Sequence, residues 1–268
     1  MLSIDIERKT YVDRGGQAHL ALADFRLQVA DGEFVCLVGP SGCGKSTLLN
    51  LIAGLDTEVQ GQVLLSDAAA GEPALRPLAE GREGIGFMFQ EPRLMPWLSV
   101  LDNVLLVAGD DPEAPARARA LLRAMELGEV LDAWPSSLSG GMQRRVALAR
   151  AFVIEPRLLL LDEPFVSLDA PTADRLRTML MQLRERRRAT VVFVTHDLRE
   201  ALALGDRVCF LSAAPARVLF EIRVDLPRPR LPGDAAVAEL QQAVLARHPE
   251  LLAGLAHEAA TVAALEAE

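Results

Sequence analysis

The spacing of hydrophobic and polar positions changes along the chain, and each change predicts a different element. In residues 1–32, apolar side chains such as Leu2, Ile4 and Ile6 alternate with polar ones. A period of two predicts antiparallel strands with one buried face. The continuous apolar run over 34–38 instead predicts a strand that is buried on both faces. Three further runs of this kind occupy residues 158–161, 190–195 and 207–212, and residues 84–89 form another apolar run that predicts a strand.

Helical spacing appears between these runs. Leu176, Met179, Leu180 and Leu183 recur at intervals of three and four residues, which predicts a helix with one apolar face. Buried strands that alternate with helices are typical of an α/β fold with a largely parallel sheet.

The segment 92–152 is different, because it is rich in helical patterns and has no strong strand run. We therefore predict four parts. Residues 1–91 form the antiparallel strands and the first part of an α/β core, 92–152 form a helical subdomain, 153–226 complete the core, and 227–268 form a helical tail. The tail could regulate, could dimerise or could pack on the core, and packing is the simplest expectation for its length.

The chemistry begins directly after the first buried strand. Residues 39–46 read Gly-Pro-Ser-Gly-Cys-Gly-Lys-Ser, which fits the phosphate-loop pattern G-x-x-x-x-G-K-[ST]. Glycines allow successive backbone N–H groups to point into one concavity, and the helix that follows adds its positive end. Lys45 can then reach the β- and γ-phosphates, and the Ser46 hydroxyl can bind Mg²⁺. Strand, loop and helix occur in the required order, which favours a nucleoside triphosphate site over a chance glycine turn.

A second candidate lies at the end of the run over 158–161, where Asp162 and Glu163 follow. Parallel sheets place ligands at the carboxyl ends of their strands. Asp162 is suited to hold Mg²⁺, and Glu163 to polarise a water that attacks the γ-phosphorus. An acidic cap on a surface turn is the alternative for this pair taken alone.

A third candidate is Ser139-Gly140-Gly141, which opens a predicted helix over 142–150. Its free N–H groups and hydroxyl face an anion in the same way as the first loop. One nucleotide rarely needs two phosphate cradles, so we expect this one to serve a nucleotide held by another copy. An ordinary glycine N-cap is the alternative.

Four single residues complete the candidates. Gln90 follows the run over 84–89 and can reach Mg²⁺ or the attacking water, and Asp169 lies just beyond the acidic strand end. His196 follows the run over 190–195 and can donate to the γ-phosphate. Tyr11 is the only tyrosine, and it can either stack on an adenine or serve as an ordinary strand aromatic.

Composition narrows the partners. The net charge of −9 and pI of about 5.1 argue against nucleic acid, whose binding needs a basic patch. Three scattered cysteines do not form a disulfide framework, which indicates a reducing cytosol. No apolar run approaches the ~20 residues that span a bilayer.

Taken together, these motifs resemble the nucleotide-binding subunit of ATP-binding cassette (ABC) transporters over residues 2 to about 230. Residues 39–47 look like the Walker A loop, 138–143 the ABC signature and 158–163 the Walker B strand, and Gln90, 167–169 and His196 match the family's Q-, D- and H-loops in order. One departure is Met142, which stands where the signature usually has glutamine, with Gln143 following. The resemblance implies a P-loop NTPase (RecA-like) core with ATP and Mg²⁺ as cofactors.

The resemblance also implies a role for each site residue. Catalysis is assigned to Glu163, His196 and Gln90, and the metal to Ser46, Gln90 and Asp162. Nucleotide binding is assigned to Tyr11, Gly39, Pro40, Ser41, Gly42, Cys43, Gly44, Lys45, Ser46, Thr47, Ser139, Gly140, Gly141 and Asp169.

A narrower resemblance, to the ATPases of nitrate/sulfonate/taurine importers, rests on residues 90–97, 100–104, 162–165 and 226–230. It implies an importer of small anionic solutes in which this subunit pairs with itself or with a homologous cassette. The subunit would be peripheral on the cytoplasmic side of the inner membrane, and a solute-binding protein would take part indirectly. The apolar residues before and including Trp97 would line a groove for an integral membrane permease, although a plain core cluster explains them equally well. The alternatives are a soluble ABC ATPase that acts on DNA or ribosomes and a lipid-trafficking complex.

Overall fold

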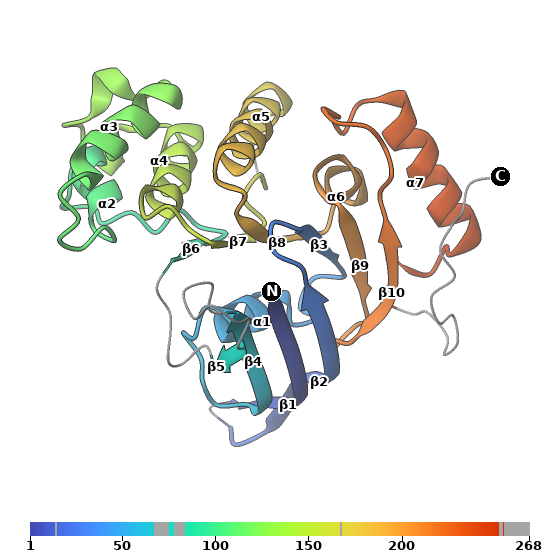
Figure 1. The fold of residues 1–268 in the computed structure, drawn as a ribbon. Coiled ribbons are helices and arrows are strands. Elements are labelled where there is room, and N and C mark those ends of the chain that lie inside the picture. Colours follow the sequence, from blue (N-terminus) through green and yellow to red (C-terminus); the bar gives the residue numbers. More distant parts are fainter. Residues whose placement is uncertain (14, 67–74, 78–83, 167, 252–253, 255–268) are drawn as a thin grey trace. The chain divides into compact units, whose positions relative to one another are not determined.

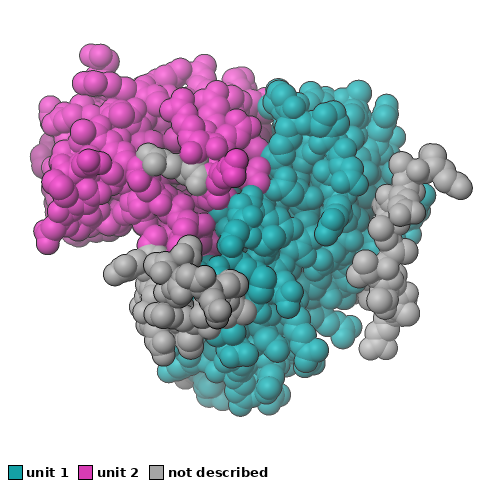
Figure 2. Space-filling view, in the orientation of Figure 1, with its two compact units in different colours: residues 1–82, 190–268 teal, residues 83–189 magenta. Residues whose placement is uncertain are grey.

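Two compact units make up the chain. The computed structural model describes residues 1–13, 15–66, 75–77, 84–166, 168–251 and 254. Unit 1 contains residues 1–82 and 190–268, and unit 2 contains residues 83–189; Figure 2 colours them teal and magenta. The four parts expected from the sequence follow motifs and composition, whereas the units follow packing, and the two sets of boundaries differ. Ser167, a member of the predicted D-loop, lies outside the described residues.

The described residues of unit 1 form an antiparallel sheet, strands of a second, largely parallel sheet, and helices (Figure 1). Its elements are β1 (Leu2–Val12), β2 (Ala18–Val29), β3 (Phe34–Val38), α1 (Lys45–Ile52), β4 (Gln60–Ser66), β5 (Leu75–Pro77), β8 (Thr190–Thr195), α6 (Leu198–Leu204), β9 (Arg207–Leu211), β10 (Val218–Arg223) and α7 (Ala235–Arg247). The antiparallel sheet has the order β2-β1-β4-β5, so the antiparallel strands expected within residues 1–32 are confirmed.

The second sheet of unit 1 carries the parallel strands. β3 lies between β8 and β9 and is parallel to both, and β10 is antiparallel to β9. Every residue of β3 and β8 is buried, which explains why these strands read as continuous apolar runs rather than alternating ones. Val38 pairs with Thr195, so β3 and β8 end at the same edge of the sheet. The predicted α/β fold is confirmed.

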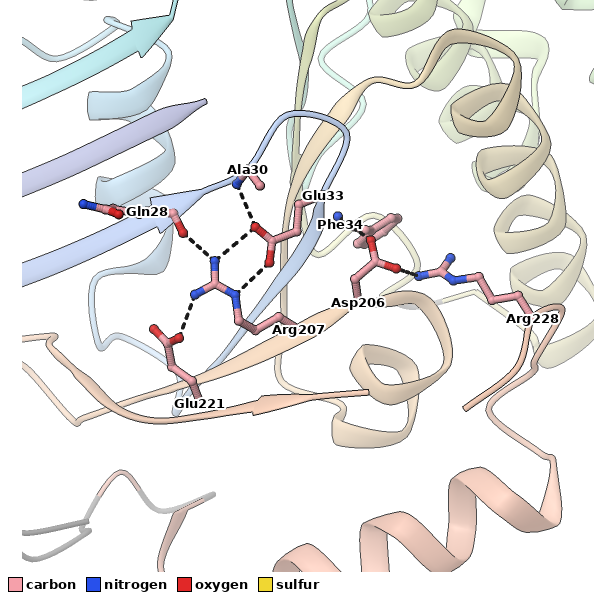
Figure 3. Close-up of polar contacts among 8 residues, drawn as sticks. All are labelled: Gln28, Ala30, Glu33, Phe34, Asp206, Arg207, Glu221 and Arg228. Carbon is pink, nitrogen blue, oxygen red and sulfur yellow. Dashed lines mark hydrogen bonds and ion pairs between the residues drawn. The ribbon is translucent and has the colours of Figure 1, made fainter. Parts of the chain in front are cut away.

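A polar network around Arg207 of β9 joins this strand to β2, to the β2–β3 turn and to β10 (Figure 3). The Arg207 guanidinium donates to Glu33 and Glu221 at 2.8 and 2.6 Å and also to the Gln28 carbonyl. Burial works against the charged form, but these carboxylates outweigh it and raise the pKa of Arg207. Because the partners come from β2, the β2–β3 turn and β10, the network holds both edges of β9.

The C-terminal part of unit 1 is tied to the end of α6. The buried Arg230 side chain donates to the carbonyls of Ala203 and Gly205, and Arg228 donates to the Leu204 carbonyl and to Asp206 at 2.6 Å. The last carbonyls of a helix have no partner within it, so two arginines satisfy and neutralise this end. α7 then packs on α6, with its apolar face buried at Val237 and Val244.

In its described residues, unit 2 is helical apart from the parallel strands β6 and β7 (Figure 1). Its elements are β6 (Ile85–Met88), α2 (Val100–Leu105), α3 (Ala114–Ala124), the 3-10 turns η2 (Gly128–Val130) and η3 (Pro135–Ser137), α4 (Gly140–Val153), β7 (Leu158–Asp162) and α5 (Ala170–Arg187). α2 and α3 pack on each other and on α4, and α4 also packs on β6. Within the described residues, no helix is long and apolar enough to cross a membrane.

Candidate nucleotide-binding site

The predicted phosphate loop connects β3 to α1 in unit 1. Gly42 and Gly44 have φ values of +78° and +117°, which L-residues with side chains rarely adopt. A Cβ on Gly44 would also lie 2.8 Å from the Ala21 carbonyl oxygen, so this position excludes any side chain. Gly44 is the N-cap of α1 and makes no side-chain cap, and the first turn has no acidic residue. The N–H groups at the start of α1, and with them the positive end of the helix dipole, therefore remain available to an anionic ligand.

Lys45 closes this loop from its own helix. The side chain is buried, and its Nζ atom donates to the carbonyls of Gly39 and Pro40 at 2.9 and 2.8 Å. An ammonium has three N–H donors, so one remains for a phosphate oxygen. Ser46 is exposed and Thr47 half-buried on the next positions of α1. The chemistry of this donor set fits a polyphosphate.

Cys43 points away from the surface of the loop. Its side chain is buried, and burial raises the pKa of the thiol above its usual value. The loop thus packs the Cys43 side chain inward, while Ser41 and Gly42 are exposed.

Two more predicted residues lie in unit 1. His196 directly follows β8, and because Val38 pairs with Thr195, His196 and Gly39 leave the sheet at the same edge. Tyr11 lies on β1, and its hydroxyl donates to Asp56 at 2.8 Å. Burial of the ring raises the pKa of Tyr11. Asp56, which accepts from the Tyr11 hydroxyl, donates through its N–H to the Asn50 carbonyl of α1, so the hydroxyl end of the ring lies near this helix.

Unit 2 brings the acidic residues together with Gln90. Asp162 is the last residue of β7 and is buried, and Glu163 follows with a φ of +43°. Left-handed backbone is costly for glutamate, and such strain gathers at functional sites. β6 runs parallel to β7 with Met88 opposite Leu161, so Gln90 leaves the same edge.

Arg144, which the sequence analysis did not single out, connects these segments. It lies on α4, and its guanidinium donates to the carbonyls of Gln90 at 2.9 Å and Pro164 at 3.1 Å. Burial lowers its pKa, as expected for a guanidinium taken from water. The side chain therefore links the start of the signature helix to the loops that carry Gln90 and Glu163.

The signature residues open α4. Ser139 is the N-cap, and its hydroxyl accepts a hydrogen bond from the Met142 N–H at 3.3 Å. Gly140 is exposed, and a Cβ on Gly141 would lie 3.0 Å from the Thr172 methyl group. Gln143 donates to the Pro135 carbonyl at 3.0 Å, so it fixes the turn before the helix.

Asp169 is the N-cap of α5, and its carboxylate accepts from the Thr172 N–H at 3.0 Å. That hydrogen bond holds the pKa of Asp169 below its usual value. The residue is therefore ionised at neutral pH and exposed next to Thr172, which contacts the Gly141 position.

The loop after Gln90 is held by two buried polar side chains that sequence reasoning also missed. Asn103 pairs with the Met95 backbone at both N–H (2.7 Å) and carbonyl (3.1 Å), and Arg150 donates to the carbonyls of Pro92 and Arg93. Trp97 remains 68% exposed on this loop. The loop has a defined shape and presents an aromatic side chain to solvent.

Comparison with known proteins adds three findings. Residues 22–166 match the family model described as ABC transporter. The chain is 48% identical over 245 residues to the aliphatic sulfonates import ATP-binding protein SsuB 2 of Burkholderia lata, covering 91% of this chain and 85% of that protein. It is 47% identical over 233 residues to the SsuB 2 protein of Pseudomonas aeruginosa, covering 86% and 81%.

Among solved structures, the chain is similar to the ATP-binding cassette MJ0796 in a dimeric post-hydrolysis state bound to ADP and Pi. The TM-score is 0.71 at 35% sequence identity, and the match covers 85% of this chain and all of that one.

Proposed function

This chain belongs to the ABC transporter family and is an ATPase cassette of that family, and we propose that it powers the import of aliphatic sulfonates. The observation that carries the proposal is the start of α1. There a left-handed glycine, a buried lysine and an uncapped helix N-terminus form a cradle suited to phosphate. Relatives named for aliphatic sulfonate import support the choice of solute.

Nucleotide binding is assigned mainly to unit 1. The backbone of residues 39–47 surrounds the phosphates, Lys45 contacts the β- and γ-phosphates, and Tyr11 stacks on the adenine. Exposure of Tyr11 beside the phosphate-binding helix supports the last role.

Unit 2 supplies the acidic groups. Glu163 polarises the attacking water and Gln90 helps to orient it, while His196 of unit 1 donates to the γ-phosphate. The strained backbone of Glu163 supports its assignment as the catalytic carboxylate. Ser46, Gln90 and Asp162 would hold Mg²⁺, which when bound neutralises charge on the phosphates.

A second copy of the chain, or a homologous cassette, completes each site. Ser139, Gly140 and Gly141 of one copy contact the nucleotide held by the other, and Asp169 couples the two sites across the interface. Two identical contacts related by a two-fold axis close such a dimer. ATP then holds the pair together and hydrolysis releases it, which gives a two-state element that can drive a membrane protein. The dimeric state of the MJ0796 cassette supports this assembly.

The membrane partner is a permease that contacts the loop from Gln90 to Trp97. The exposed Trp97 side chain, on a loop whose backbone is fixed by Asn103 and Arg150, supports this assignment. The subunit is then peripheral on the cytoplasmic face of the inner membrane, and a solute-binding protein takes part only through the permease.

The test begins with a tagged chain purified from host membranes in mild detergent. We expect a polytopic membrane protein to co-purify in equal stoichiometry, and liposomes that hold the complex to accumulate a labelled aliphatic sulfonate only with ATP. Uptake of the sulfonate without ATP, or recovery of the chain with ribosomes or nucleic acid, would contradict the proposal.

A further inference from the structure

A buried lysine lies behind Tyr11. Lys9 is only 2% exposed, although strand lysines ordinarily keep their ammonium in water. Its Nζ atom donates to the Asp56 carboxylate at 2.8 Å and to the Glu58 carbonyl at 2.6 Å. Burial of a charge is costly unless it is paired, and both partners here are close.

A break in the strand pairing places Lys9 inward. β1 buries its even positions up to Ile6, and the pairing of β1 with β4 then skips Glu7, since Ile6 lies opposite Gly61 and Arg8 opposite Gln60. A bulge of this kind shifts the phase of the strand and turns later side chains to the other face. Gly61 has a φ of +125°, and a Cβ there would lie 2.3 Å from the Asp5 carbonyl oxygen, so the break requires a glycine opposite it.

Lys9 and Tyr11 are two residues apart and lie on the same face of the strand. The Lys9 Nζ atom is 4.6 Å from the centre of the Tyr11 ring. Because Lys9 is buried and Tyr11 is 40% exposed, the exposed part of the ring is away from the cation. One face of the ring is thus held by a cation–π contact, and the ring keeps an exposed part that a base could cover.

Asp56 joins the ring to the lysine and to the phosphate-binding helix. Its Oδ1 atom accepts from Lys9 and its Oδ2 atom accepts from the Tyr11 hydroxyl at 2.8 Å. The Asp56 N–H in turn donates to the carbonyl of Asn50 in α1 at 3.2 Å. Burial opposes ionisation of Asp56, but the bonds from Lys9 and Tyr11 outweigh it and hold its pKa below its usual value.

We propose that Lys9 and Asp56 are positioning residues that hold the Tyr11 ring ready to stack on the nucleotide base, and so set how much the base adds to affinity. The inference rests on the proposed function, in which Tyr11 contacts the adenine. Asp56 fixes the hydroxyl end of the ring, and Lys9 fixes one face. The ring is therefore pre-ordered relative to α1, which reduces the entropy lost on binding.

The test compares ADP, which carries a base, with pyrophosphate, which does not, and neither is consumed by hydrolysis. We expect Asp56→Asn and Lys9→Met each to weaken ADP binding about fivefold while pyrophosphate binding changes less than about twofold, since base–aromatic stacking is worth about one factor of ten or more. Tyr11→Ala should weaken ADP binding further, and adding Asp56→Asn to it should cause no additional loss. Asp5→Asn, which removes an exposed ion pair from the same strand, serves as the matched control.

Three results would overturn the inference. If Asp56→Asn weakens ADP and pyrophosphate equally, the pair only maintains the fold of unit 1. If Tyr11→Ala leaves ADP binding unchanged, the base does not use this ring, and nucleotide binding through the phosphate loop still stands. If the unaltered protein binds neither ADP nor pyrophosphate, the proposed function fails and the inference fails with it.

Discussion

Two helix N-termini of this chain, those of α1 and α4, both have glycines at or next to their first residue and both offer N–H groups to an anion, yet they are built differently. α1 begins at a left-handed glycine without a side-chain cap and carries a buried lysine. α4 begins at Ser139, whose hydroxyl already accepts from Met142, and it has no lysine in its first turn. We therefore propose that the start of α1 binds a polyphosphate by itself, whereas the start of α4 only adds contacts to a nucleotide that is held elsewhere.

The largest expected effect comes from removing the lysine of α1. Lys45→Ala should lower the affinity for ATP at least about a hundredfold, because in the proposed function the ammonium contacts phosphate, and in the structure it bridges the carbonyls of Gly39 and Pro40. Calorimetric titration with ATP, alongside circular dichroism to check folding, measures this. If a folded Lys45→Ala variant binds ATP with unchanged affinity, the lysine is not what distinguishes the α1 N-terminus from the α4 N-terminus as a phosphate site.

The second effect should appear in assembly rather than in binding. Ser139→Ala should leave the ATP affinity of a single copy within about twofold but weaken ATP-dependent dimerisation at least about tenfold. The loss of an N-cap also costs about 1 kcal/mol of stability. Ser99→Ala is the matched control, because Ser99 caps α2 of the same unit through the Asp102 N–H at 3.1 Å. Equal dimerisation in the two variants would show that Ser139 is only a cap.

The smallest effect concerns the thiol inside the α1 loop. Only the thiolate reacts with iodoacetamide, and the raised pKa of Cys43 means that little thiolate exists at neutral pH. The alkylation rate should rise about tenfold per pH unit through pH 9, and ATP should slow it. Mass spectrometry distinguishes a label on Cys43 from one on Cys36 or Cys209, which are also free and buried. A rate that levels off below pH 8 would contradict the buried position.

Local motifs explain how the residues of the candidate site could be selected from the sequence. The phosphate loop, the carboxylates at the end of β7 and the glycines that open α4 each lie within one short segment, and the adjoining strands β3 and β7 are buried along their whole length. The parallel strands β3, β7, β8 and β9 could therefore be predicted from their continuous apolar runs. β4 was missed, because its first residues, Gln60 to Gln62, are exposed and give no strand pattern.

Long-range contacts explain what could not be predicted. Lys9 falls on an outward position if the alternation of Leu2, Ile4 and Ile6 is continued, and only the skipped residue in the pairing with β4 turns it inward. Arg144 looks like an ordinary helix arginine, because its two carbonyl partners are 54 and 20 residues away along the chain. The motifs therefore indicate the residues of the candidate site, whereas the side chains that position them, such as Lys9 and Arg144, are recognised only in the folded structure.

The most direct measurement is sedimentation velocity of the Glu163→Gln variant with ATP and Mg²⁺. We predict that the variant binds ATP without turnover and sediments as a dimer, and that it is monomeric with ADP. Glu155→Gln serves as the control, because Glu155 also has a positive φ (+53°) and is near β7, and this variant should retain turnover. A Glu163→Gln protein that binds ATP yet remains a monomer at every concentration would contradict the claim that two copies complete each nucleotide site.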